Sequence, residues 1–130
     1  MRESSEQFAA RSLALQDKLP LECDGFSRAH SYLLQRDSIE HEIHVGSLTL
    51  EGVGRIGLHW WLQLPGGAVC DARARMWLGS DPRVPHGAFL PSPQQVYRTH
   101  DIHSLDFSPL VFWVLTGKVI EAFPSAWAGA

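Results

Sequence analysis

A tight Pro-Gly-Gly turn between two β-rich segments constrains the fold of this chain more than any other feature. The turn, Pro65-Gly66-Gly67, follows residues 55–64 and precedes residues 68–72. Proline and glycine in this arrangement are typical of a short chain reversal, so the two segments are predicted to pair as antiparallel strands. The alternating segment 40–50 precedes them, and turn-forming residues at 51–54 connect it to the rest. The sequence therefore predicts a three-stranded antiparallel meander.

Two helices are predicted before this meander. Residues 3–17 carry an imperfect apolar stripe that ends ahead of Pro20, because the residue before a proline avoids the helical conformation. Residues 23–36 repeat apolar side chains every three to four positions, as a helix with one buried face does. The predicted fold class is α+β, with a helix that begins at Cys23 and packs against one face of an antiparallel sheet.

The segment after the meander predicts a long loop, one more strand and a final helix. Residues 79–93 are rich in proline and glycine, which is typical of a surface loop that borders a site. Residues 94–99 are predicted as a fourth strand. The helix is expected from Pro109 onward, well buried, and ending at Gly117.

Length and composition predict one domain and exclude several classes of protein. The chain has 130 residues, enough for one core, and a formal net charge of −3, which argues against a nucleic-acid partner. No apolar run approaches the roughly 20 residues of a membrane helix. The two cysteines do not make a disulfide framework, and no export signal is evident, so we expect a cytoplasmic protein. Its oligomeric state stays open.

Three side chains have the types and the order of a nucleophilic triad. Cys23 begins a helix, where the positive end of the helix dipole favours a thiolate. His59 would take the thiol proton and return it to a leaving group, while Asp71 would fix the imidazole tautomer. The tight turn places residues 57–59 roughly opposite residues 71–73, and cross-strand neighbours lie about 5 Å apart. Contact between His59 and Asp71 is therefore expected.

These residues resemble the transglutaminase-like branch of the papain-like cysteine peptidases. The motifs that carry the resemblance are Cys23-x-Gly25-Phe26-Ser27 at a helix start, His59-x-Trp61 on a strand, and Asp71 after a glycine-containing hairpin. The family includes peptidases, amidases, deamidases and acyl-transferring crosslinkers. Its small members, such as the leader peptidases of lasso-peptide maturation, are similar in size to this chain.

The resemblance implies a cysteine-dependent amide hydrolase or acyltransferase that acts on a peptide or protein and needs no cofactor. Cys23 would be the nucleophile that forms a thioester, His59 the general base and acid, and Asp71 the orienting carboxylate. Gln16, seven residues before Cys23, would supply an oxyanion donor. The single domain would contain an N-terminal helix (1–18), a catalytic core (19–78), and a loop, extra strand and C-terminal helix (79–130).

Residues near the triad are candidates for binding and shielding. Trp61 should lie on the same face of its strand as His59 and shield the His–Asp pair, because side chains alternate along a strand. Trp60, Trp61 and Arg73 are candidates for substrate binding. Arg73 also fits a solvated rim, together with Arg75 and Arg83. Cys70 is expected to be an inert core thiol.

Two other functions stay open. The bulk of Trp60, where the family often has a small residue, fits an inactive relative that binds a protein partner in the same groove. The HxxH spacings at 41–44 and 100–103 suggest zinc. On a strand, however, residues three apart point to opposite faces, so neither pair converges easily on one metal, and no metal site is predicted.

Overall fold

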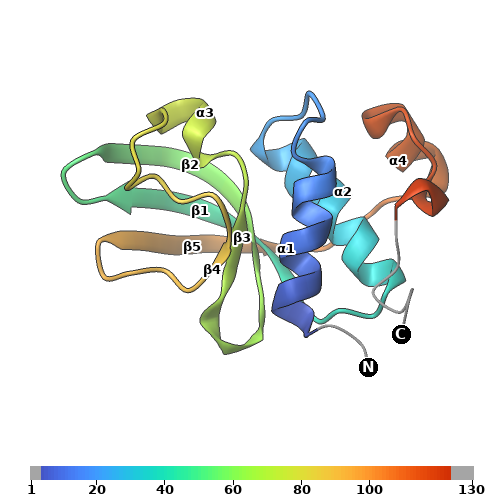
Figure 1. Ribbon diagram of the computed structural model, residues 1–130, viewed down its shortest axis with the longest axis horizontal. Coiled ribbons are helices and arrows are strands. Elements are labelled where there is room, and N and C mark those ends of the chain that lie inside the picture. Colours follow the sequence, from blue (N-terminus) through green and yellow to red (C-terminus); the bar gives the residue numbers. More distant parts are fainter. Residues whose placement is uncertain (1–3, 124–130) are drawn as a thin grey trace.

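The computed structural model describes residues 4–123, which form an antiparallel sheet with helices layered against it (Figure 1). The sheet has five strands in the order β4-β3-β2-β1-β5. In chain order the elements are α1 (Ser5–Gln16), α2 (Cys23–Arg36), β1 (Glu42–Leu50), β2 (Gly54–Gln63), η1 (Pro65–Gly67), β3 (Val69–Asp71), α3 (Ala74–Leu78), β4 (Gly87–Phe89), β5 (Gln95–His103), α4 (Pro109–Thr116) and η2 (Ile120–Ala122). The predicted α+β class is confirmed.

Helix α2 begins at the predicted residue, Cys23, and α1 begins at Ser5, within the predicted range 3–17. At the start of α1, the Ser4 hydroxyl accepts a hydrogen bond from the Gln7 N–H, and the Gln7 side chain accepts one from the Ser4 N–H. Helix α2 begins at Cys23 after the non-helical Glu22, whose side chain makes no capping hydrogen bond. The first N–H groups of α2 are therefore left uncapped by the side chain that precedes them.

Helices α1 and α2 lie between the sheet and α4 (Figure 1). The largest core cluster joins α1 and α2 to one face of the sheet. Its buried members are Phe8, Ala9, Leu13, Phe26, Leu34, Ile39, Ile43, Leu62, Leu64, Ala68, Cys70 and Ala72. A second cluster, around Leu48, Ile56 and Val84, contains the buried Ala74 at the start of α3. The apolar stripe predicted for the first helix is thus its buried side, except for the exposed Leu15.

The sheet curls strongly, which brings non-adjacent strands together. Strand β5 pairs with β1 at one edge of the sheet, yet the Tyr97 hydroxyl on β5 contacts Asp71 on β3. Gly46 lies where β1 meets both His59 of β2 and Thr99 of β5, next to shifts in the register of both pairings. A Cβ atom at position 46 would come 1.9 Å from the Arg98 carbonyl oxygen. Only glycine allows this close approach between the strands.

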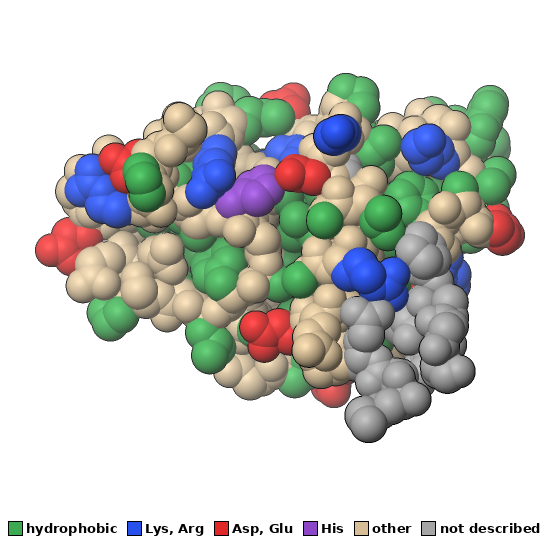
Figure 2. Space-filling view, viewed as in Figure 1, with side chains coloured by type: hydrophobic (Ala, Val, Ile, Leu, Met, Phe, Trp, Pro, Cys, Tyr) green, Lys and Arg blue, Asp and Glu red, His purple; other side chains and the backbone are tan. Residues whose placement is uncertain are grey.

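Three features differ from the sequence-based expectation. Helix α4 is not well buried, because only Phe112 and Thr116 are buried, Leu115 is half-buried and the other apolar side chains are exposed, Leu110 by 66%. Figure 2 shows hydrophobic side chains along the outer edge of this region. Strand β5 extends to His103, beyond the predicted end at 99. The short α3 and the short β4 were not predicted as separate elements.

Across residues 4–123, no helix combines the length and the apolar character that crossing a bilayer requires.

Candidate active site

A buried hydrogen bond joins two of the three predicted triad residues. His59 Nε2 lies 2.7 Å from Asp71 Oδ2, and both side chains are almost completely excluded from solvent. Because a carboxylate only accepts, Nε2 carries the proton and donates it. The β2–β3 register pairs Leu62 with Cys70, so by extension Trp61 stands opposite Asp71 and His59 is its diagonal neighbour on the same face. The expected His–Asp contact is confirmed.

The Asp71 carboxylate receives hydrogen bonds at both oxygens. Oδ2 accepts from His59 and from the Tyr97 hydroxyl at 2.7 Å, and Oδ1 accepts from the backbone N–H groups of Arg73 and Ala74 at 3.1 and 3.2 Å. Four donors compensate the loss of water around a buried anion. Burial, and then the neighbouring Asp71 charge, raises the pKa of Tyr97, so the phenol keeps its proton and remains a donor.

Trp61 covers the His–Asp pair from the side. Its ring is fully buried and stacks on the His59 ring at a centroid distance of 6.1 Å. The same ring meets Tyr97 edge-on at 4.9 Å. The expected shielding is therefore confirmed, and the hydrogen bond between His59 and Asp71 lies in an environment without competing water. Polar interactions are stronger in such surroundings than at the surface.

Cys23 is the first residue of α2 and lies next to the His59 ring. The residue is 8% exposed and forms no disulfide. Its interaction with His59 is one of the causes that raise the pKa of the histidine. Within residues 4–123, His59 Nδ1 has no hydrogen-bond partner of ordinary geometry, although it is buried. The ring thus holds Asp71 with one nitrogen and leaves the other uncommitted beside a thiol.

The electrostatics of His59 favour a charged imidazole. Burial lowers its pKa, but the hydrogen bond to Asp71 and the interaction with Cys23 outweigh burial and raise the pKa from 6.5 to about 9. At neutral pH the ring is therefore mostly an imidazolium. A cation beside a thiol, together with the N-terminus of a helix, favours the thiolate, which is the nucleophilic form.

Cys70 has a different environment from Cys23. It lies next to Asp71 in β3 but belongs to the apolar cluster between the sheet and the helices. Burial, more than the nearby carboxylates, raises the pKa of this thiol to about 12. A thiol with such a pKa stays protonated at neutral pH. The prediction that Cys70 is a core residue is confirmed.

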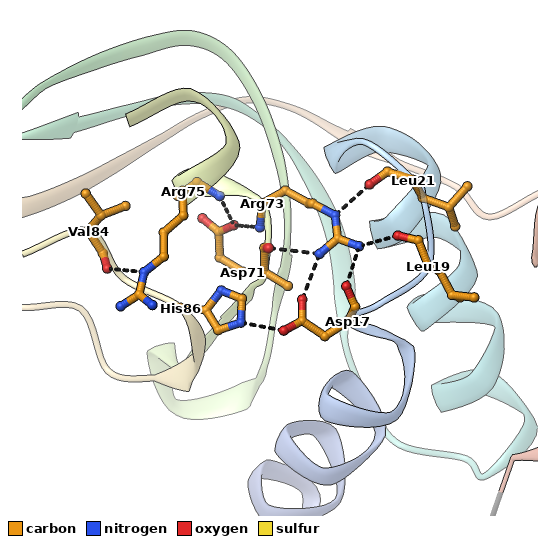
Figure 3. Close-up of polar contacts among 10 residues, drawn as sticks. Asp17, Leu19, Leu21, Asp71, Arg73, Arg75, Val84 and His86 are labelled. Carbon is orange, nitrogen blue, oxygen red and sulfur yellow. Dashed lines mark hydrogen bonds and ion pairs between the residues drawn. The ribbon is translucent and has the colours of Figure 1, made fainter. Parts of the chain in front are cut away.

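Arg73 does not form a solvated rim, because its guanidinium is buried against the chain that leads into α2 (Figure 3). All five of its N–H donors are used, within 2.5 to 3.1 Å. Nε donates to the Leu21 carbonyl, and the two terminal nitrogens donate to the carboxylate and carbonyl of Asp17 and to the carbonyls of Leu19 and Ala72. No guanidinium donor is left for a substrate, contrary to the predicted binding role.

Trp60 lies away from the place predicted for it, and the role of Gln16 is not tested by the structure. Trp60 points away from His59, packs against the core between sheet and helices, and meets the His103 ring edge-on at 4.7 Å. Its side chain therefore does not lie between His59 and Trp61 on the face of β2 that carries the candidate site. Gln16 is the last residue of α1, and its side chain lies outside the described part of the structure. The oxyanion role of Gln16 stays a prediction.

Three further histidines, His30, His41 and His44, have polar partners of their own. His41 Nε2 contacts the Ser31 hydroxyl at 2.6 Å, and His44 contacts Thr99 and Glu42. In the part of the chain that the structure describes, no three metal-ligating side chains converge. His30 is buried against Ser12, and burial lowers its pKa to about 3, so it is neutral at physiological pH.

The sequence did not reveal three residues of this region. Tyr97 lies on the predicted fourth strand, but its contact with Asp71 depends on the curl of the sheet. Asp17 binds Arg73, and its other oxygen contacts His86 Nε2 at 2.9 Å. His86 comes from the proline-rich loop that was expected to border a site. This loop position was the one sequence signal that pointed to His86.

Compared with protein-family models, with curated proteins and with solved structures, the chain gives no significant match.

Proposed function

We propose that this protein is a cysteine-dependent amide hydrolase or acyltransferase with a papain-like, transglutaminase-like core. The observation that carries the proposal is the His59 ring. Its Nε2 is bound to Asp71, its Nδ1 is uncommitted, and Cys23 stands beside it at the start of a helix. A nucleophile, a base and an orienting acid in this order are the groups that covalent catalysis needs, and their proximity supports the proposal.

The chemistry follows from which nitrogen is free. In the resting site the thiol proton has already moved to Nδ1, which leaves a Cys23 thiolate beside the His59 imidazolium, and the sulfur attacks the carbonyl carbon of a peptide or side-chain amide. The C–N bond then breaks as Nδ1–H gives its proton to the leaving amine, which leaves a thioester on Cys23. Water delivers a proton to Nδ1 and its oxygen to the carbonyl, so that the C–S bond breaks and a carboxylate leaves. An amine in place of water forms a new amide.

Two surrounding features support this sequence of steps. Nε2–H stays on Asp71 throughout, so the ring keeps its orientation while Nδ1 exchanges protons. The backbone N–H of Cys23, at an N-terminus without a side-chain cap, is available to the oxyanion of the tetrahedral intermediate. The substrate would be a peptide or protein, and hydrolysis is the favoured outcome.

The test is covalent trapping by a thiol-directed amide-mimic probe, followed by mass spectrometry of the labelled peptide. We expect one label at Cys23, none in Cys23→Ala, and unchanged labelling of Cys23 in Cys70→Ala. Replacement of His59 by glutamine should slow the labelling strongly, because the base is gone. Labelling of Cys70, or equal labelling of Cys23→Ala, would show that the assignment is wrong.

The small exposed fraction of Cys23, 8%, favours one other function. In this second proposal the protein is an inactive relative that binds a protein partner over the same site. Cys23→Ala would then keep the biological effect at unchanged stability. Loss of the effect in that variant would reject the second proposal and support the first.

A further inference from the structure

Arg73 connects the two halves of the candidate site. The thiol comes from the helical layer, at the start of α2, whereas the histidine and the aspartate come from β2 and β3. The relative position of these layers therefore sets the distance between the Cys23 sulfur and the His59 ring. Figure 3 shows the Arg73 side chain extending from beside Asp71 to the connection between α1 and α2.

On the sheet side, Arg73 is tied directly to the triad. Its backbone N–H donates to Asp71 Oδ1 at 3.1 Å, and the other oxygen of the same carboxylate holds His59. The Arg73 side chain has only 8% of its surface exposed. A shift of residue 73 would therefore change the hydrogen bonding of the carboxylate that orients the imidazole.

On the helical side, the guanidinium holds the short connection that ends at Cys23. It bonds to the carbonyls of Asp17, Leu19 and Leu21 at 3.1, 2.9 and 2.5 Å. These three groups lie on the residues that carry the chain from α1 into α2. The guanidinium carbon also lies 4.0 Å from the ring centroid of Phe26, on the first turn of α2.

We propose that Arg73 is a positioning residue that sets the Cys23–His59 geometry, and not a substrate-binding residue. The proposal rests on the proposed function of Cys23. The planar guanidinium has five N–H donors and can bond acceptors spread over several residues. A lysine cannot hold all of these acceptors, because its three donors share one nitrogen. Arg73→Lys keeps the charge and removes the planar guanidinium, so it separates positioning from electrostatics.

The experiment measures the rate of Cys23 alkylation by iodoacetamide between pH 5.5 and 9, in wild-type protein and in Arg73→Lys. Wild-type Cys23 should react as a thiolate below pH 7. In Arg73→Lys the profile should move toward that of an ordinary thiol, and the rate at pH 6 should fall at least tenfold. With the amide-mimic probe, the maximal inactivation rate should fall and the half-saturating concentration should stay constant.

Arg36→Lys is the matched control. Arg36 ends α2, about 20 Å from Cys23 by the rise of the helix, and its guanidinium likewise bonds backbone carbonyls, those of Ile120 and Phe123 at 2.8 Å each. This variant should lower the melting temperature and leave the Cys23 profile unchanged. Asp17→Asn, which removes the negative charge that pairs with the Arg73 guanidinium, should shift the profile in the same direction as Arg73→Lys, and it provides a second variant if the first does not fold.

The outcomes separate the two proposals. If wild-type Cys23 already reacts like an ordinary thiol, the proposed function fails. If wild-type Cys23 is activated and both Arg73→Lys and Asp17→Asn keep the wild-type profile, only the positioning role is overturned. An equal shift of the pH profile in Arg36→Lys would also overturn the positioning role of Arg73, because the shift would then reflect a general destabilisation of the fold.

Discussion

Replacement of Asp71 by asparagine should make the Cys23 thiol much less reactive while the fold stays largely unchanged. The carboxylate accepts four hydrogen bonds, and an amide in its place keeps one acceptor oxygen and turns the other position into a donor. The charge that raises the pKa of His59 disappears, whereas the burial that lowers this pKa stays. The ring should then be mostly neutral at pH 7.

The size of the effect on the thiol can be estimated from ionised fractions. An ordinary thiol with a pKa near 8.5 is only about 0.3% ionised at pH 6. A thiolate held by an imidazolium stays largely ionised at that pH, although its lower basicity reduces its nucleophilicity by about tenfold. The net result is a rate of alkylation at pH 6 that is roughly 30-fold lower in Asp71→Asn than in wild type. The lost charged hydrogen bonds should also cost about 2–3 kcal/mol of unfolding free energy.

The assay is iodoacetamide alkylation at several pH values, with the modified cysteine identified by mass spectrometry. Circular dichroism shows whether the variant is folded, and Asp106→Asn, which changes an exposed carboxylate, is the control. A folded Asp71→Asn that reacts with the wild-type rate and pH profile would refute the reasoning, since the carboxylate would then have no influence on the thiol.

Other predictions concern stability. Because the pKa of His59 is raised to about 9, the folded state binds this proton more tightly than the unfolded state does. The resulting stabilisation of roughly 3 kcal/mol is present below pH 6.5 and is lost as the pH rises to 9. Urea unfolding at several pH values should show this decline in wild type and not in His59→Gln. Because the pKa of His30 is lowered to about 3, the folded state binds this proton less tightly than the unfolded state does, and the free energy of unfolding should fall as the pH drops from 6.5 toward 3. In His30→Gln this loss of stability at low pH should be smaller. Tyr97→Phe removes one donor to the buried Asp71 carboxylate and should lower the free energy of unfolding, measured in urea, by about 1–2 kcal/mol. A variant as stable as wild type would contradict a stabilising hydrogen bond between Tyr97 and Asp71. Gly46→Ala forces a Cβ into the backbone of β5 and should cost about 3 kcal/mol or more in thermal unfolding, whereas Gly57→Ala, which meets only a flexible side chain, should cost much less.

The local features of the site could be predicted because they depend on residues close in sequence. The start of α2 at Cys23 follows from a proline upstream and a helical repeat downstream. The His59–Asp71 contact follows from one tight turn, which fixes the register of two strands. Trp61 was placed correctly by strand alternation alone.

The features that were missed depend on how distant segments pack. No sequence pattern shows that β5 curls back far enough for Tyr97 to reach Asp71. The role of Arg73 depends on carbonyl groups far from it in the chain, and every residue has a carbonyl. Helix α4 was expected to be buried because it is apolar, but composition alone does not show whether a partner surface covers a helix.

The division of the site between helical layer and sheet has a consequence for protein synthesis. The thiol leaves the ribosome well before the strands that supply its base and acid, so the nascent chain carries an ordinary, weakly reactive cysteine. Under the proposed function, the thiol becomes reactive only when the hairpin has closed and docked on the helices. Completion of folding would then be the step that activates Cys23.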